Sequence, residues 1–138
     1  MYERILVALD HSAVADRVVT AAKELADGSA AKVWVLHLRE REVIPRLGLV
    51  ATESDSEAAA TVDGAAKTLA DAGIDVSAEV RDTVFGYAAR EIVEDAKLHD
   101  VNVIVMGSRG RGDLAGLMLG STAHKVIHLA DRPVLVVR

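Results

Sequence analysis

The sequence predicts one α/β domain over residues 1–138, with a five-stranded parallel sheet covered by helices on both faces. Two observations support this fold class. Short runs rich in β-branched residues alternate along the chain with segments whose apolar residues recur every three or four positions. Four of the five apolar runs are nearly continuous, as in strands that are buried on both faces. A strict alternation of strands and helices favours a doubly wound sheet with right-handed crossovers.

Five segments are predicted to be strands. Val76 to Val80 alternates apolar and polar residues, which is typical of a strand at the edge of a sheet. The four continuous runs are Ile5 to Leu9, Val33 to Leu38, Val101 to Met106 and Val134 to Val137.

Four helices are predicted between these strands from the spacing of their apolar residues and from the residues that end them. Glycine ends the first two helices, and a proline follows the last. The predicted helices run from the possible cap Ser12 to Gly28, from about Ser56 to Ala72, from about Tyr87 to Leu98, and from about Ser121 to Ala130.

The connection from Arg39 to Asp55 is longer than the others and mixes charged residues with Ile44, Leu47, Leu49 and Val50. Connections of that length are often mobile or functional, so a lid or a partner surface is one interpretation. A variable surface loop is the favoured one.

Composition excludes several classes of protein. The chain is 51% hydrophobic and 27% charged, which is the composition of a folded domain. A net charge of −5 argues against nucleic acid or an anionic membrane as a partner, since both attract clustered Lys and Arg. The absence of cysteine excludes disulfides, thiol catalysis and cysteine-ligated metal. With no leader pattern and no long apolar run, a cytoplasmic protein is expected.

The densest group of glycines follows the fourth predicted strand, at Gly107, Gly110 and Gly112, and Gly120-Ser121 then leads into the last helix. Glycine lets backbone N–H groups turn toward an anion and approach it closely. A helix N-terminus adds unpaired N–H groups and the positive end of the helix dipole. This arrangement predicts a phosphate-binding loop, and a tight turn without a ligand is the alternative.

The sequence does not fully match either of two common phosphate-binding motifs. Gly107 and Gly112 have the glycine spacing of a Walker loop, but Asp113 stands where the lysine belongs. Gly110, Gly112 and Ala115 satisfy G-x-G-x-x-A, but a dinucleotide fingerprint follows the first strand of its unit and leads directly into a helix.

The spacing that fits is G-x2-G-x9-G-S, formed by Gly107, Gly110 and Gly120-Ser121. Through it the chain resembles the universal stress protein family, specifically the ATP-binding branch, whose signature is G-x2-G-x9-G-[S/T]. The resemblance extends over essentially the whole chain. Its blocks are ILVALD at Ile5 to Asp10, VLHL at Val35 to Leu38, VIVMGSRGRG at Val103 to Gly112, LGSTAHKV at Leu119 to Val126 and RPVLVV at Arg132 to Val137.

The resemblance implies a Rossmann-like sheet of the adenine nucleotide alpha hydrolase type, with strand order 3-2-1-4-5. Ligands of open α/β sheets bind beyond the carboxyl ends of the strands where the strand order reverses. Here that point lies between the first and fourth strands. Asp10 and Gly107 would therefore be neighbours.

The resemblance also implies which residues contact the nucleotide. Asp10 would position the ribose, and an N-terminal cap for the first helix is its alternative role. Ala8 and Leu9 would line the site through their backbone. Leu38 would contact adenine and Met106 would lie on the same apolar surface, although both are equally suited to the core.

The phosphate cradle is expected to comprise Gly107, Gly110, Gly120 and Ser121. Further contacts are expected from Ser108, Arg109, Arg111, Gly112 and Thr122. Arg109 and Arg111 add local positive charge to an acidic chain, but exposed arginines also point into solvent.

Among the five histidines, His124 and His128 have helical i, i+4 spacing, but no H-E-x-x-H pattern accompanies them, so no metal site is expected. His37 on the second strand is expected to be structural. No catalytic residue is assigned.

The function predicted from this resemblance is a nucleotide-dependent stress-response or signalling module that binds ATP, with or without Mg²⁺. Two alternatives stay open: a slow ATP hydrolase, and a structural dimer that binds AMP, cyclic AMP or no nucleotide. Enzymatic activity is at most weak hydrolysis, because no base or water-positioning group is evident. A homodimer through Val134 to Val137 is expected, since an apolar edge strand leaves backbone groups unpaired.

Overall fold

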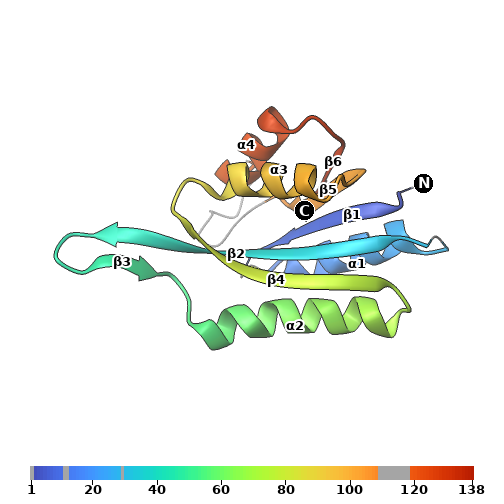
Figure 1. Cartoon of the computed structure of the whole chain (residues 1–138), viewed down its shortest axis with the longest axis horizontal. Helices are drawn as coiled ribbons and strands as arrows, with labels where there is room; N and C mark the ends of the chain where they lie inside the picture. The colour runs from blue at the N-terminus through green and yellow to red at the C-terminus, as the bar shows by residue number, and fades with distance from the viewer. Residues whose placement is uncertain (1, 11–12, 29, 109–118) are drawn as a thin grey trace.

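The computed structural model describes residues 2–10, 13–28, 30–108 and 119–138. Within these ranges, strands and helices alternate along the chain as the sequence predicts, with one additional strand (Figure 1). In chain order the elements are β1 (Arg4–Leu9), α1 (Ala15–Ala26), β2 (Lys32–Ile44), β3 (Gly48–Ala51), α2 (Asp55–Asp71), β4 (Asp75–Val84), α3 (Ala88–Leu98), β5 (Val103–Gly107), α4 (Ser121–Leu129) and β6 (Val134–Val137).

All six strands belong to one sheet. The five parallel strands lie in the order β4-β2-β1-β5-β6, because β1 pairs with both β2 and β5 while β4 and β6 form the edges. The strands β1, β2, β4, β5 and β6 correspond to the first to fifth predicted strands. Their order in the sheet is therefore 3-2-1-4-5, which confirms the predicted order. The sheet has six strands rather than five, because β3 pairs antiparallel with the far end of β2.

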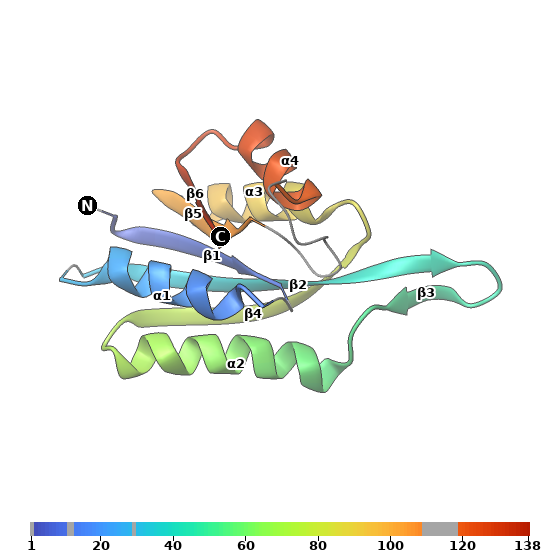
Figure 2. The same cartoon turned by 180° about the vertical axis from the view of Figure 1, so that it is seen from behind.

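Helices cover both faces of the sheet, as predicted. Figures 1 and 2 show α1 and α2 on one face and α3 and α4 on the other. One core lies under α1 and α2 around Ile5, Val33 and Leu69, and a second lies under α3 and α4 around Leu6, Leu36 and Ile104. Successive residues of β1 and β2 thus enter opposite cores, which explains why these strands are continuously apolar. No helix among the described residues has the length and apolarity that a membrane span requires.

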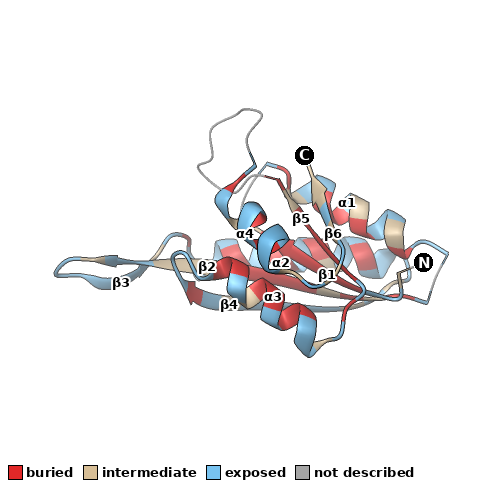
Figure 3. Cartoon of the chain, turned by 90° about the horizontal axis from the view of Figure 1, so that it is seen from above, coloured by how far each residue is buried: buried red, intermediate tan, exposed pale blue. Residues whose placement is uncertain are grey.

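The segment from Arg39 to Asp55 is not the surface loop that we expected. β2 continues to Ile44, and the chain turns back through β3, forming a hairpin that extends beyond the rest of the sheet (Figure 3). The turn uses positive φ angles at Arg46 and Gly48. Four charged residues open the hairpin at Arg39 to Glu42, and its apolar residues Val43, Leu49 and Val50 are exposed, so the segment has no buried apolar face and resembles a loop in the sequence.

The helix ends differ from prediction by a few residues. α1 begins at Ala15 without a side-chain cap, and the predicted cap Ser12 lies outside the described residues. α2 begins at Asp55 because the Ser54 hydroxyl accepts a hydrogen bond from the Glu57 N–H at 3.1 Å. The third helix begins at Ala88 and the fourth ends at Leu129, each within one residue of prediction.

The burial of Leu69 gives a test of the first core. Leu69 on α2 is fully buried against β4, so Leu69→Ala is expected to lower the free energy of unfolding by about 2–5 kcal/mol. Leu98→Ala is the matched control: this leucine, at the end of α3, is 75% exposed, and its loss is expected to change stability by less than about 0.5 kcal/mol. Urea denaturation measures both. Equal destabilisation by the two substitutions would contradict the packing described.

Candidate functional site

The carboxyl ends of three neighbouring strands meet at one edge of the sheet. In the pairing register, Leu9 lies beside His37 of β2, and Ala8 lies beside Met106 of β5. Asp10 follows β1 directly, and Gly107 ends β5. Since β2 and β5 lie on opposite sides of β1, the strand order reverses at this point, and ligands of open α/β sheets bind there.

The N-terminus of α4 lies next to this edge. The Gly120 N–H donates to the Ser108 carbonyl at 2.6 Å, so the start of the helix is held directly against the end of β5. Gly120 is the N-cap residue and supplies no side-chain cap, and the first turn of α4 holds no acidic residue. The first N–H groups of a helix have no partner within it. Those of Ser121, Thr122 and Ala123 are therefore suited to an anion.

A cavity of about 530 Å³ lies at this edge. The ends of β1, β2 and β5 form its floor, and its walls come from the starts of α1, α3 and α4 and from the base of the β2–β3 hairpin. Apolar residues such as Leu36, Ile92 and Phe85 line much of it. This size and a largely apolar lining with a few polar groups are typical of a site for a small organic ligand.

Charges are distributed unevenly around the cavity. The carboxylates of Asp10, Glu40 and Glu53 reach it from β1, β2 and the hairpin base, whereas Lys125 and the N-terminus of α4 belong to the wall that α4 forms. Burial is the main cause that raises the pKa of Glu40, and the nearby carboxylates of Glu42 and Asp10 add to it, while Lys125 acts in the opposite direction. One side of the cavity therefore favours hydrogen-bond donors and the other favours an anion.

A buried His37–Glu53 pair forms part of the acidic side. The Nδ1 atom of His37 lies 2.8 Å from the Leu9 carbonyl oxygen, and its Nε2 atom is hydrogen-bonded to Oε1 of Glu53. Both side chains are almost fully buried. This confirms a structural role for His37, which links the ends of β1 and β2 to the residue that follows the hairpin.

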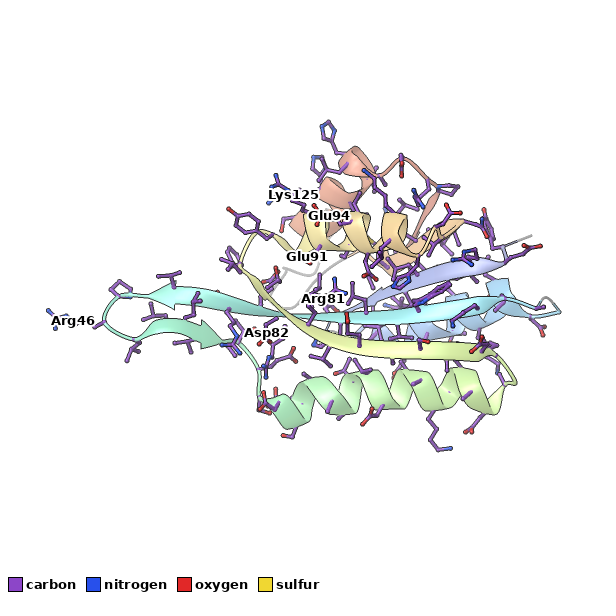
Figure 4. The ribbon with its side chains drawn as sticks, viewed as in Figure 1. Arg46, Arg81, Asp82, Glu91, Glu94 and Lys125 are labelled. Atoms are coloured by element: carbon purple, nitrogen blue, oxygen red, sulfur yellow. The ribbon has the colours of Figure 1, made fainter. Side chains whose placement is uncertain are left out.

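The base of the hairpin is fixed by further contacts. The Thr52 N–H donates to the Glu40 carbonyl at 3.1 Å, and the guanidinium of Arg39 donates two hydrogen bonds to Asp82 on β4, at 2.7 and 3.1 Å. Hydrogen bonds from Arg39, and then from Arg41, hold the pKa of Asp82 below its ordinary value. Figure 4 shows Asp82 near the hairpin base and Arg46 at its distant tip. The wall formed by Glu40, Thr52 and Glu53 is thus tied to the sheet.

Comparison with known proteins identifies the family. The model of the universal stress protein family matches residues 1–138, the whole chain. The chain belongs to the universal stress protein family. It is 31% identical to the universal stress protein YxiE of Bacillus subtilis, over the full length of both.

Two similar solved structures of universal stress proteins are complexes with a nucleotide. The universal stress protein of Archaeoglobus fulgidus in complex with dAMP is 28% identical, with a TM-score of 0.73 over 99% of this chain and 98% of that one. A universal stress protein in complex with cAMP is 26% identical, with a TM-score of 0.70 over 99% of this chain and 97% of that one.

Within this family member, the structure brings most of the predicted site residues together. Gly120 is buried beside the cavity without lining it, and Arg109, Gly110, Arg111 and Gly112 lie outside the described residues. Leu38 lies within β2 rather than at its end, because that strand continues into the hairpin. The predicted residues that line the cavity are Ala8, Leu9, Asp10, Leu38, Met106, Gly107, Ser108, Ser121 and Thr122.

Sequence reasoning missed Glu40, Thr52, Glu53 and Lys125, all of which line the cavity. The first three belong to the segment that the sequence predicts to be a surface loop. Only recognition of the hairpin would have placed them beside the strand ends. His124 and His128 do not belong to a metal-binding cluster: no group of three or more potential metal ligands occurs among the residues that the structure describes.

The environment of Glu40 predicts a pH-dependent stability. Because the folded protein favours protonated Glu40, this residue contributes stability below its ordinary pKa of 4.5, and the contribution is lost as the pH rises through the raised value. Glu40→Gln is therefore expected to melt at a higher temperature than the wild type at about pH 7, and the difference is expected to vanish near about pH 3. Thermal melts of the exposed control Glu24→Gln are expected to match the wild type at both pH values. A Glu40→Gln variant that melts lower at about pH 7 would contradict a raised pKa for the Glu40 carboxyl.

Proposed function

We propose that this protein binds an adenine nucleotide, with ATP as the predicted ligand, in the cavity at the carboxyl ends of β1, β2 and β5. One observation carries the proposal: a cavity of suitable size lies where the strand order reverses, with the N-terminus of α4 in its wall. The bound nucleotide would make this domain a nucleotide-dependent stress-response or signalling module.

The phosphates would lie against Gly107, Ser108 and the first turn of α4. The helix dipole contributes roughly 0.3–1 kcal/mol to holding an anion there, and each hydrogen bond from an N–H or hydroxyl to a charged phosphate contributes about 1.5–3 kcal/mol. Ser121 and Thr122 supply both kinds of donor. The N–H of Gly120 is bonded to Ser108, so this glycine would act by positioning the helix. We also expect contacts to the phosphates from four residues outside the described ranges, Arg109, Gly110, Arg111 and Gly112.

The nucleoside would extend toward β1 and β2. Asp10 would accept hydrogen bonds from the ribose hydroxyls, and the apolar side chains of Leu38 and Met106 would contact the base. The backbone of Ala8 and Leu9 would complete the floor. Two related structures are complexes with dAMP and cAMP, which share a 6-aminopurine and a phosphate.

Mg²⁺, when it accompanies a triphosphate, takes many of its ligands from phosphate oxygens and water. It therefore requires few protein ligands. Asp10 directly follows β1, whose neighbour β5 ends at the proposed phosphate region. It would be the residue to coordinate such an ion or to hold one of its waters.

A negative charge introduced at the start of α4 tests the phosphate site. Ser121→Asp is expected to weaken ATP binding at least about tenfold, because a carboxylate at this position repels phosphate while it favours the helix itself. Isothermal titration with ATP, AMP and cyclic AMP measures the affinity and the preferred nucleotide, and phosphate release measures any hydrolysis.

The matched control is Ser56→Asp, the same substitution in the first turn of α2, away from the cavity. It is expected to leave the affinity unchanged. Absence of binding by the wild type, or equal weakening by both substitutions, would refute the proposed site.

We also propose that the protein forms a homodimer through β6. This strand pairs with β5 on one side, and Leu135 is 38% exposed on it. Leu135→Lys is expected to convert a dimeric mass into a monomeric one in light scattering, because a buried charge opposes edge pairing. The control Leu98→Lys, on a residue that is 75% exposed at the end of α3, is expected to stay dimeric. A monomeric wild type would end this proposal.

A further inference from the structure

Glu53 has a carboxyl oxygen without a partner. The residue is 8% exposed and lines the cavity, and its Oε1 atom is bonded to His37. Its Oε2 atom is buried and has no hydrogen-bond partner among the described residues. Buried polar atoms are paired in the great majority of cases, so an unpaired one on a residue that lines a cavity calls for a reason.

The hydrogen bonds of His37 define what Oε2 can do. Because a carbonyl oxygen only accepts, the Nδ1–H of His37 donates to Leu9. Nε2 and Oε1 then share one proton, which belongs either to an imidazolium beside a carboxylate or to a carboxylic acid beside a neutral imidazole. In both arrangements Oε2 has no proton. It is an acceptor, and a ligand that satisfies it must bring an N–H or O–H donor.

The position of Glu53 indicates which part of a nucleotide it would meet. From β5 to β1 to β2 the sheet advances two strand spacings, roughly 10 Å, and Glu53 lies against His37 of β2. A phosphate at the end of β5 and a ribose beside Asp10 would leave the base near β2. The donor that reaches Glu53 would therefore come from the base rather than from the sugar.

We infer that Glu53 is a specificity-determining residue, whose Oε2 atom accepts a hydrogen bond from the amino group of a 6-aminopurine nucleotide. This inference rests on the proposed nucleotide site. It distinguishes adenine from hypoxanthine, which carries an oxygen in place of the amino group and would place two acceptors together. A site with a buried unpaired acceptor rejects an analogue that lacks the donor.

The test compares ATP with inosine triphosphate in the wild type, Glu53→Gln and Glu53→Met. The wild type is expected to bind ATP about 10- to 100-fold more tightly than inosine triphosphate. Glu53→Met, which has no acceptor, is expected to bring that ratio close to one, and Glu53→Gln, whose acceptor is uncharged, to give an intermediate ratio. Glu57→Met, on an exposed residue four positions later, is expected to keep the wild-type ratio.

The ratio separates recognition from a purely structural role. If Glu53 only holds the hairpin base through His37, its loss lowers the affinity for both nucleotides by the same factor and leaves the ratio unchanged, which would overturn the inference. Deoxy-ATP provides a second arm: a Glu53-dependent preference for ATP over deoxy-ATP would assign the donor to the ribose and would also overturn it.

Two further outcomes distinguish this inference from the function on which it rests. Binding of ATP and inosine triphosphate with equal affinity by the wild type would refute the role of Glu53 and leave the nucleotide site standing. Failure of both to bind would refute the nucleotide site itself. Thermal melting shows whether each variant is folded. The comparison of ATP with inosine triphosphate in the wild type tests the inference even if a variant fails to fold.

Discussion

The parallel pairing of β1 with both β2 and β5 is the constraint on which the site depends. It places the ends of three strands at one level, so that Leu9, His37 and Met106 lie within neighbouring register positions although they are far apart in the chain. The crossover connections then place α1 on one face of the sheet and α3 and α4 on the other. The cavity opens where these helices diverge, and its floor belongs to the most deeply buried part of the sheet.

The two sides of the cavity owe their character to different parts of the chain. The side that favours an anion is built from backbone: the end of β5, and the first turn of α4, held there by the hydrogen bond from Gly120 to Ser108. The acidic side is built from side chains, of which two belong to the base of the β2–β3 hairpin. Backbone groups recognise a phosphate without regard to what it carries. Side chains at the other end are where discrimination between ligands can arise.

The parallel strands, the four helices and the strand order could be predicted because their apolar patterns are strong and because the glycine spacing resembles that of a known family. The hairpin could not. Its strands are solvated, so Arg39 to Glu42 present no apolar face and resemble a charged connection. Asp10, Met106 and Gly107 could be predicted as site residues because the family resemblance implies them, and the strand order makes Asp10 and Gly107 neighbours. Glu53 comes from the hairpin, and only the folded chain brings it to His37.

The His37–Glu53 pair shows how the hairpin and the cavity are linked. A buried ionisable pair is costly unless its hydrogen bonds are nearly complete. The Leu9 carbonyl completes those of the histidine, but Glu53 is left with one unpaired oxygen. Replacing such a pair by apolar residues is often neutral or favourable for stability, so packing alone gives no reason for a histidine and a glutamate here. The pair thus holds the hairpin base through His37, and the proposed recognition of a ligand donor accounts for the oxygen of Glu53 that these contacts leave unpaired.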